Sequence, residues 1–78
     1  MRGYSQLVVE ANQQADPHHV GVMLGRVCIA HKISASVIAE ELDISRQTVY
    51  DWFSGRVKPA KEKESTIMQL IQRLTETN

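Results

Sequence analysis

The amino-acid sequence predicts an all-α fold: a compact bundle of five short helices that contains a helix-turn-helix. Apolar residues recur at helical spacing in five successive segments, and residues that start or stop helices separate these segments. The chain has 78 residues, of which 42% are hydrophobic, so it suits one domain and is too apolar to be disordered. We therefore expect a single domain over residues 1–78.

The first two helices are predicted over residues 4–15 and 17–32. The first belongs to an N-terminal helical extension, residues 1–16, and its thin apolar stripe consists of Tyr4, Leu7, Val8, Ala11 and Ala15. The second begins at Asp16-Pro17, because aspartate is a good N-cap and proline suits the first helical position. Its apolar face carries Val20, Met23, Leu24, Val27 and His31.

Two glycines lie four residues apart on the second predicted helix, at Gly21 and Gly25. Each costs the helix about 1 kcal/mol relative to alanine. We expect them to admit a close neighbour, either the N-terminal helix or a second subunit.

Residues 35–55 have the pattern of a helix-turn-helix, ASVIAEELDISRQTVYDWFSG. Ser34 caps the first helix of this motif, which has small Ala39 for a close crossing and an apolar face of Val37, Ile38 and Leu42. The turn is Asp43-Ile44-Ser45, and Ser45 caps the second helix. That second helix buries Val49 and Trp52 and ends at Gly55.

The opposite side of the second helix is polar and carries Arg46, Gln47, Tyr50, Asp51 and Ser54. Arg46 can donate twice to guanine and Gln47 can pair with adenine, so these two are predicted base readers. Tyr50 is either a groove or phosphate contact or a solvated tyrosine. Asp51 either accepts from a cytosine amino group or holds Arg46 or Gln47 in place.

A loop over residues 56–60 and a last helix over residues 61–75 complete the chain, with Ile67, Leu70, Ile71 and Leu74 facing the core. Arg46, Arg56, Lys58, Lys61 and Lys63 crowd into the recognition helix and the segment after it. The net charge is nevertheless zero, since nine basic residues balance nine acidic ones. A basic face on a neutral protein predicts weak non-specific binding to nucleic acid.

The segment ISRQTVYDWFSGRVKP resembles the core of the Cro/phage-repressor (XRE-type, lambda-repressor-like) DNA-binding domains. The matching features are Ala39, Ile44, Trp52, Gly55 and the basic-proline run Arg56-Val57-Lys58-Pro59. Asp43 stands where the family usually has glycine, so we expect Asp43 to adopt the left-handed conformation. Ala35 replaces the glutamine that often clamps a phosphate in this family.

The resemblance implies a phosphate-binding set around the recognition helix. Its expected members are Ser34, Ser36, Ser45, Thr48, Arg56, Lys58 and Lys61. Ser34 or Ser36 would replace the missing glutamine clamp, while Arg56 and Lys58 lie in the loop where the family places backbone contacts.

Several other functions find no support in the sequence. His18, His19, Cys28 and His31 lie along one predicted helix and cannot converge on a metal ion, and Cys28 reads as a small core residue. No nucleophile has an evident base partner, so we expect no enzyme and no cofactor. No apolar run is long enough to cross a membrane, and no signal peptide is evident.

The sequence thus predicts a sequence-specific transcription regulator of phage or bacterial origin, acting as a cytoplasmic repressor that occupies an operator. It is expected to bind double-stranded DNA as a homodimer. The dimer contact is expected either through the N-terminal half, with Val22, Ile29 and Ile33, or through the last helix near Met68. The alternative is a protein-interaction module, antitoxin-like or phage-encoded, that uses the same scaffold.

Overall fold

The computed structural model describes residues 4–76, and these residues form five α-helices and no strand. The helices are α1 (Gln6–Gln14), α2 (Val20–Ala30), α3 (Ala35–Leu42), α4 (Arg46–Phe53) and α5 (Lys61–Glu76). The predicted all-α fold is therefore confirmed. Residues 1–3 of the expected N-terminal extension, and residues 77–78, lie outside the described residues.

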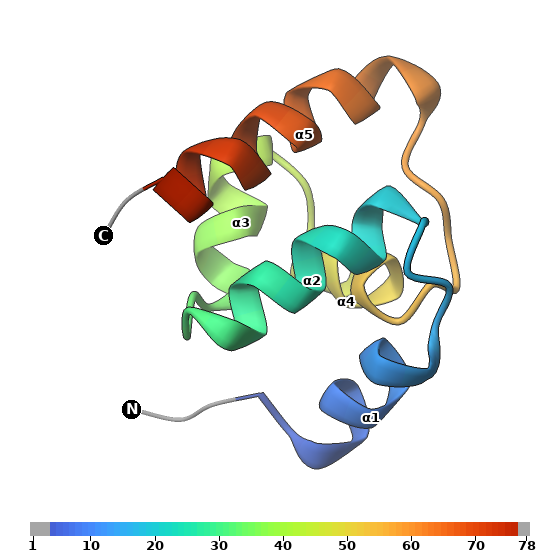
Figure 1. Ribbon diagram of the computed structural model, residues 1–78. Helices are drawn as coiled ribbons and strands as arrows, with labels where there is room; N and C mark the ends of the chain where they lie inside the picture. Colours follow the sequence, from blue (N-terminus) through green and yellow to red (C-terminus); the bar gives the residue numbers. More distant parts are fainter. Residues whose placement is uncertain (1–3, 77–78) are drawn as a thin grey trace.

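Helix α2 is the central element of the bundle, in contact with α1, α4 and α5 (Figure 1). Helix α5 passes along one side of α2, and α1 lies on the other side. Helix α3 packs against α4, and α1 also contacts α4. The predicted recognition helix α4 is thus fixed by three neighbours.

The core takes buried side chains from four helices, α2 to α5: Leu24, Cys28, Ala35, Ile38, Ala39, Val49, Trp52, Phe53, Ile67 and Leu70. Trp52 and Cys28 are core residues, as the sequence predicted. The expectation for Val37 was wrong, because this side chain is 52% exposed. Ala35, Ile38, Ala39 and Leu42 share the inward side of α3 at spacings of three and four residues, and Val37 falls outside it.

The start of α2 also differs from the prediction. The helix begins at Val20, and its N-cap is His19, whose Nδ1 accepts from the main-chain N–H of Gly21 (3.1 Å) and Val22 (3.3 Å). His19 is buried. Asp16 instead closes the preceding turn, accepting from the His18 N–H at 2.9 Å, and this main-chain bond lowers the Asp16 pKa. Asp16 and Pro17 are local helix-start signals, but they lie in the turn before the helix. They therefore placed the predicted boundary three residues too early.

The C-terminal end of α2 was also predicted too late. The helix ends at Ala30, with His31 as C-cap, and the His31 side chain is exposed rather than part of the apolar face. Lys32 follows in the left-handed region with φ of 58°, which turns the chain toward α3.

Helix α1 is more than an extension, because its buried residue is the polar Asn12. The side-chain Nδ2 of Asn12 donates to the carbonyls of Val22 (3.1 Å) and Phe53 (2.8 Å). Leu7, expected in the apolar stripe, is 79% exposed. The amide of Asn12 therefore ties α1 to α2 and to the end of α4.

Gly25 and Gly21 provide the close approach that the sequence predicted, with α4 as the main neighbour. A Cβ built on Gly25 would lie 2.6 Å from Asn12 Nδ2 and 2.9 Å from Phe53 Cγ. A Cβ on Gly21 would lie 2.7 Å from Trp52 Cβ. The expected contact with the N-terminal helix exists at Gly25, and the glycines also bring α4 against α2.

The segment joining α3 to α4 follows the prediction closely. Asp43 is left-handed, with φ of 56° and ψ of 51°, and the Ile44 N–H then donates to the Ala39 carbonyl at 2.9 Å. Ser34 caps α3 and Ser45 caps α4 through their hydroxyl oxygens. A three-residue turn, residues 43–45, therefore connects the two packed helices.

Candidate functional site

Helix α4 presents one buried and one exposed side. Val49, Trp52 and Phe53 are buried, and Phe53 was missed by the sequence analysis although it is fully covered. Phe53 lies four residues after Val49, so the same helical spacing that predicted Trp52 in the core also indicated Phe53. Packing of the buried side therefore holds the exposed side in place.

Arg46 and Gln47, the predicted base readers, are both exposed in the first turn of α4. Tyr50 and Asp51 lie one turn further along and are half-buried. The structure therefore brings the four predicted readers together on one stretch of helix surface, with Arg46 and Gln47 the more accessible pair.

Tyr50 is partly covered by Tyr4, which lies in the segment before α1. The rings of Tyr4 and Tyr50 meet edge to face, with centroids 6.4 Å apart and an interplanar angle of 83°. Tyr4 also contacts the Phe53 ring, at a centroid distance of 5.8 Å, and its hydroxyl donates to the Ile33 carbonyl. Tyr50 is thus neither a freely solvated tyrosine nor a fully exposed reader.

Asp51 joins the exposed side of α4 to the loop that follows it. Its Oδ1 accepts from Gln47 Nε2 at 3.1 Å and lies 4.0 Å from Nη1 of Arg56. Its main-chain carbonyl accepts from the N–H groups of Arg56 (2.9 Å) and Val57 (3.3 Å). Of the two alternatives for Asp51, holding Gln47 in place is the one that a contact in the free protein supports.

Three of the hydroxyl residues expected to contact phosphates, Ser34, Ser45 and Thr48, already form hydrogen bonds within the protein. Ser34 Oγ accepts from the Val37 N–H at 3.3 Å, and Ser45 Oγ accepts from the Thr48 N–H at 3.1 Å. The Ser45 and Thr48 hydroxyls also lie 2.9 Å apart. A hydroxyl that accepts one bond can still donate another, so capping leaves the Ser34 proton available to a ligand oxygen. Ser36 is exposed in the first turn of α3.

The predicted basic residues Arg56, Lys58 and Lys61 are all exposed and follow α4 directly. The loop that carries two of them is anchored at both ends. The main-chain bonds to Asp51 hold its start, and Pro59 is buried near its end. These cations therefore stand on an ordered segment beside the exposed side of α4.

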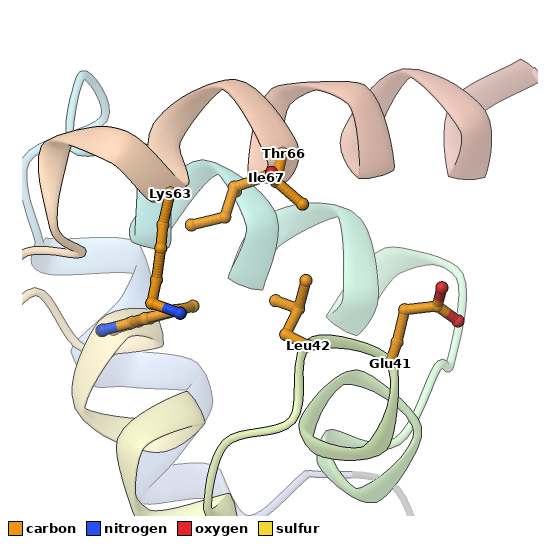
Figure 2. Close-up of a pocket in the computed structure, with 6 residues that line it drawn as sticks. Glu41, Leu42, Lys63, Thr66 and Ile67 are labelled. Carbon is orange, nitrogen blue, oxygen red and sulfur yellow. The ribbon is translucent and has the colours of Figure 1, made fainter.

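A hollow between α3, α4 and α5 is a further surface feature (Figure 2). It measures about 170 Å³ and is lined by Glu41, Leu42, Trp52, Lys63, Thr66 and Ile67. Leu42 and Ile67 approach each other across it, and the Lys63 side chain extends from α5 along one side. Trp52 reaches this hollow from the buried side of α4, away from Gln47.

Within residues 4–76, neither Cys28 nor the other side chains of metal-binding type form a second candidate site. Burial raises the pKa of the Cys28 thiol to about 12, so the thiol is protonated at neutral pH and is a poor nucleophile. Among residues 4–76, no cluster of three or more His, Cys, Asp or Glu side chains is placed to hold a metal ion.

Comparison with known proteins adds no relative: no family model, curated protein or solved structure matches the chain. Within the described part of the chain, none of the helices is both long and apolar enough to span a membrane.

Proposed function

We propose that this protein is a sequence-specific double-stranded DNA-binding transcription regulator, a repressor of the Cro/phage-repressor kind. The observation that carries the proposal is the arrangement of α4. Arg46 and Gln47 are exposed in its first turn, while its other side is buried against α1, α2 and α3. A recognition helix enters the major groove with its N-terminal residues, so these two side chains would meet the base edges.

Side-chain chemistry indicates which residues would contact bases and which would contact phosphates. Arg46 donates to O6 and N7 of guanine, and Gln47 pairs with adenine. Arg56, Lys58 and Lys61 neutralise phosphates beside the groove, with the hydroxyls of Ser34, Ser36, Ser45 and Thr48 as further donors. Because the net charge of the chain is zero, base contacts must supply a large part of the affinity.

Titration of the full chain against duplex DNA at several salt concentrations tests the proposal. The logarithm of the binding constant should fall by about 0.9 for each phosphate neutralised per tenfold rise in salt. Selection from a random duplex library should return a defined site. Duplexes that stay unbound at low salt would contradict the proposal and favour a protein-interaction role.

Two substitutions separate reading from phosphate binding. Gln47→Ala should remove the preference at one base pair and leave non-specific affinity nearly unchanged. Lys58→Ala should weaken binding to every sequence alike and lower the salt slope by about one unit. Arg73→Ala is the matched control, because Arg73 is an exposed cation that pairs with Glu41 at 3.3 Å. An Arg73→Ala effect as large as that of Lys58→Ala would contradict the assignment.

Occupation of an operator is proposed to involve two copies, since one recognition helix reads only a few base pairs. Val22 is fully buried, so it cannot belong to a dimer contact, and the predicted N-terminal interface loses that residue. Among the described residues, the exposed large apolar side chains are Leu7, Val37, Val57 and Met68. Leu7 on α1 and Met68 on α5, which are 79% and 44% exposed, belong to the two segments predicted to form the dimer contact.

Sedimentation of Leu7→Glu and Met68→Glu variants, free and on operator DNA, identifies the contact. Surface substitutions suit this test better than a truncation of residues 1–15, because the truncation would remove the buried Asn12 and disturb the core. The variant that becomes monomeric marks the interface. A wild-type chain that remains monomeric on its operator at about tens of micromolar, the range typical of weak dimers, would exclude the dimer.

A further inference from the structure

We infer that Asp51 is a positioning residue that selects the base read by Gln47, because it fixes the orientation of the Gln47 side-chain amide. The inference rests on the proposed function and deepens it. It assigns Asp51 a role through Gln47 rather than a base contact of its own.

The contact that carries the inference lies within α4, between side chains four residues apart. Gln47 Nε2 donates to Asp51 Oδ1 at 3.1 Å, and the two residues lie on the same side of the helix. Gln47 is exposed, whereas the Asp51 side chain is only 25% exposed. The less exposed partner therefore constrains the more exposed one.

Asp51 is itself held firmly enough to act as a reference point. Its main-chain carbonyl accepts the N–H groups of Arg56 and Val57, and the Ser54 hydroxyl donates to the same carbonyl at 3.3 Å. The Arg56 guanidinium lies 4.0 Å from the carboxylate. These contacts join Asp51 to the loop after α4, so its position does not depend on Gln47 alone.

The chemistry of the pair fixes which end of the amide faces outward. An ionised carboxylate only accepts hydrogen bonds, so it must face the Nε2 end of Gln47. The Oε1 atom and one hydrogen on Nε2 then remain for a ligand. One acceptor and one donor match the N6 amino group and N7 of adenine.

Guanine requires the Gln47 amide to present a different set of hydrogen-bonding groups. Its major-groove edge offers two acceptors, O6 and N7, which a glutamine satisfies only by donating both Nε2 hydrogens. Asp51 occupies one of these hydrogens in the free protein. Removal of the carboxylate should therefore relax the choice between adenine and guanine at the base pair that Gln47 reads.

A double-mutant cycle on the full chain tests this inference. Binding of the wild type, Gln47→Ala, Asp51→Ala and the double variant is measured on two duplexes, which carry A·T or G·C at the Gln47-dependent position. The readout is the ratio of the two affinities, in which any general gain from the loss of a negative charge cancels. Glu62→Ala removes an exposed carboxylate from α5 and serves as the charge control.

The wild type should prefer the A·T duplex by roughly five-fold or more. Asp51→Ala should reduce this preference by roughly two-fold or more when Gln47 is present, and should leave the ratio unchanged in the Gln47→Ala background. Glu62→Ala should leave the ratio at its wild-type value. In the free protein, Asp51→Ala should shift the NMR resonances of the Gln47 side-chain amide, and Glu62→Ala should not.

The failures are distinguishable. If Gln47→Ala removes a base preference and Asp51→Ala does not alter it, the inference is wrong while the proposed function stands. The same holds if Asp51→Ala changes the ratio equally in both backgrounds, since Asp51 would then contact a base itself. A wild-type chain that binds no duplex overturns the proposed function, and the inference falls with it.

Discussion

The side-chain amide of Asn12, on α1, donates to the main-chain carbonyl of Phe53 at the end of α4, across 2.8 Å and 41 positions of sequence. The last carbonyls of a helix have no partner within the helix, so Asn12 supplies one that Phe53 would otherwise lack. The same amide nitrogen also donates to the Val22 carbonyl. One polar side chain therefore joins three helices.

Asn12→Ala should lower the free energy of unfolding by about 1–3 kcal/mol, because two carbonyls lose a buried donor. Urea denaturation followed by circular dichroism measures the change. Gln13→Ala is the matched control, since the neighbouring Gln13 side chain is exposed. Equal stability of the Asn12→Ala and Gln13→Ala variants would show that the Asn12 contacts contribute little.

Gly25→Ala should destabilise the protein by about 1–3 kcal/mol although alanine is the better helix former. The added Cβ would lie 2.6 Å from Asn12 Nδ2 and 2.9 Å from Phe53 Cγ, so α1 or α4 must move. Thermal and urea denaturation report the cost. A stabilised Gly25→Ala variant would mean that these neighbours shift without penalty and that helix propensity dominates.

Asp43→Gly should be neutral or stabilising by up to about 1 kcal/mol, because Asp43 has a φ of 56° and glycine adopts this conformation without strain. Lys32→Gly is a matched second site, with a φ of 58°. Asp43→Val should cost more than Asp43→Gly, since a β-branched residue is strained there. If Asp43→Gly markedly lowers the urea midpoint, the Asp43 side chain contributes a contact of its own.

Stability should fall at alkaline pH more steeply in the wild type than in Tyr4→Phe. Burial raises the pKa of Tyr4 above its usual range, with smaller contributions from Cys28 and Tyr50. A group whose folded-state pKa is raised contributes stability that is complete below its unfolded pKa, about 10 for tyrosine, and is lost as the pH rises above it. Burial also raises the pKa of Cys28, so stability is lost through this thiol as well above its usual pKa of about 8.5. This loss is expected in the wild type and in Tyr4→Phe alike.

Urea midpoints at about pH 8 and pH 10.5, on either side of the tyrosine pKa, measure this difference. Tyr4→Phe loses the hydroxyl bond to the Ile33 carbonyl, so it should be less stable at the lower pH but should change less between the two. An identical decrease in both proteins would assign the alkaline loss to groups other than Tyr4.

Local signals in the sequence were sufficient for much of the fold. Ser34 and Ser45 cap helices and Trp52 is buried, each as predicted from residue type and spacing, and Asp43 is left-handed, as the family resemblance implied. These features depend on interactions within one or two helical turns, which the sequence displays directly. The exposed positions of Arg46 and Gln47 follow for the same reason, because they lie opposite an apolar stripe.

Only the tertiary structure decided the features that depend on distant partners. A polar residue such as Asn12 is not expected in a core until the carbonyls of Val22 and Phe53 are placed beside it. Val37 is exposed, contrary to the prediction, because Ile38 and Ala39 rather than Val37 join the core on the side of α3 that packs against α4. The hydrogen bond from Gln47 Nε2 to Asp51 Oδ1 joins residues only one turn apart, but it too required the structure, since side-chain hydrogen bonds depend on rotamers that spacing alone does not define. Periodicity determines which side of a helix is buried, whereas tertiary packing determines what each buried or half-buried polar group contacts.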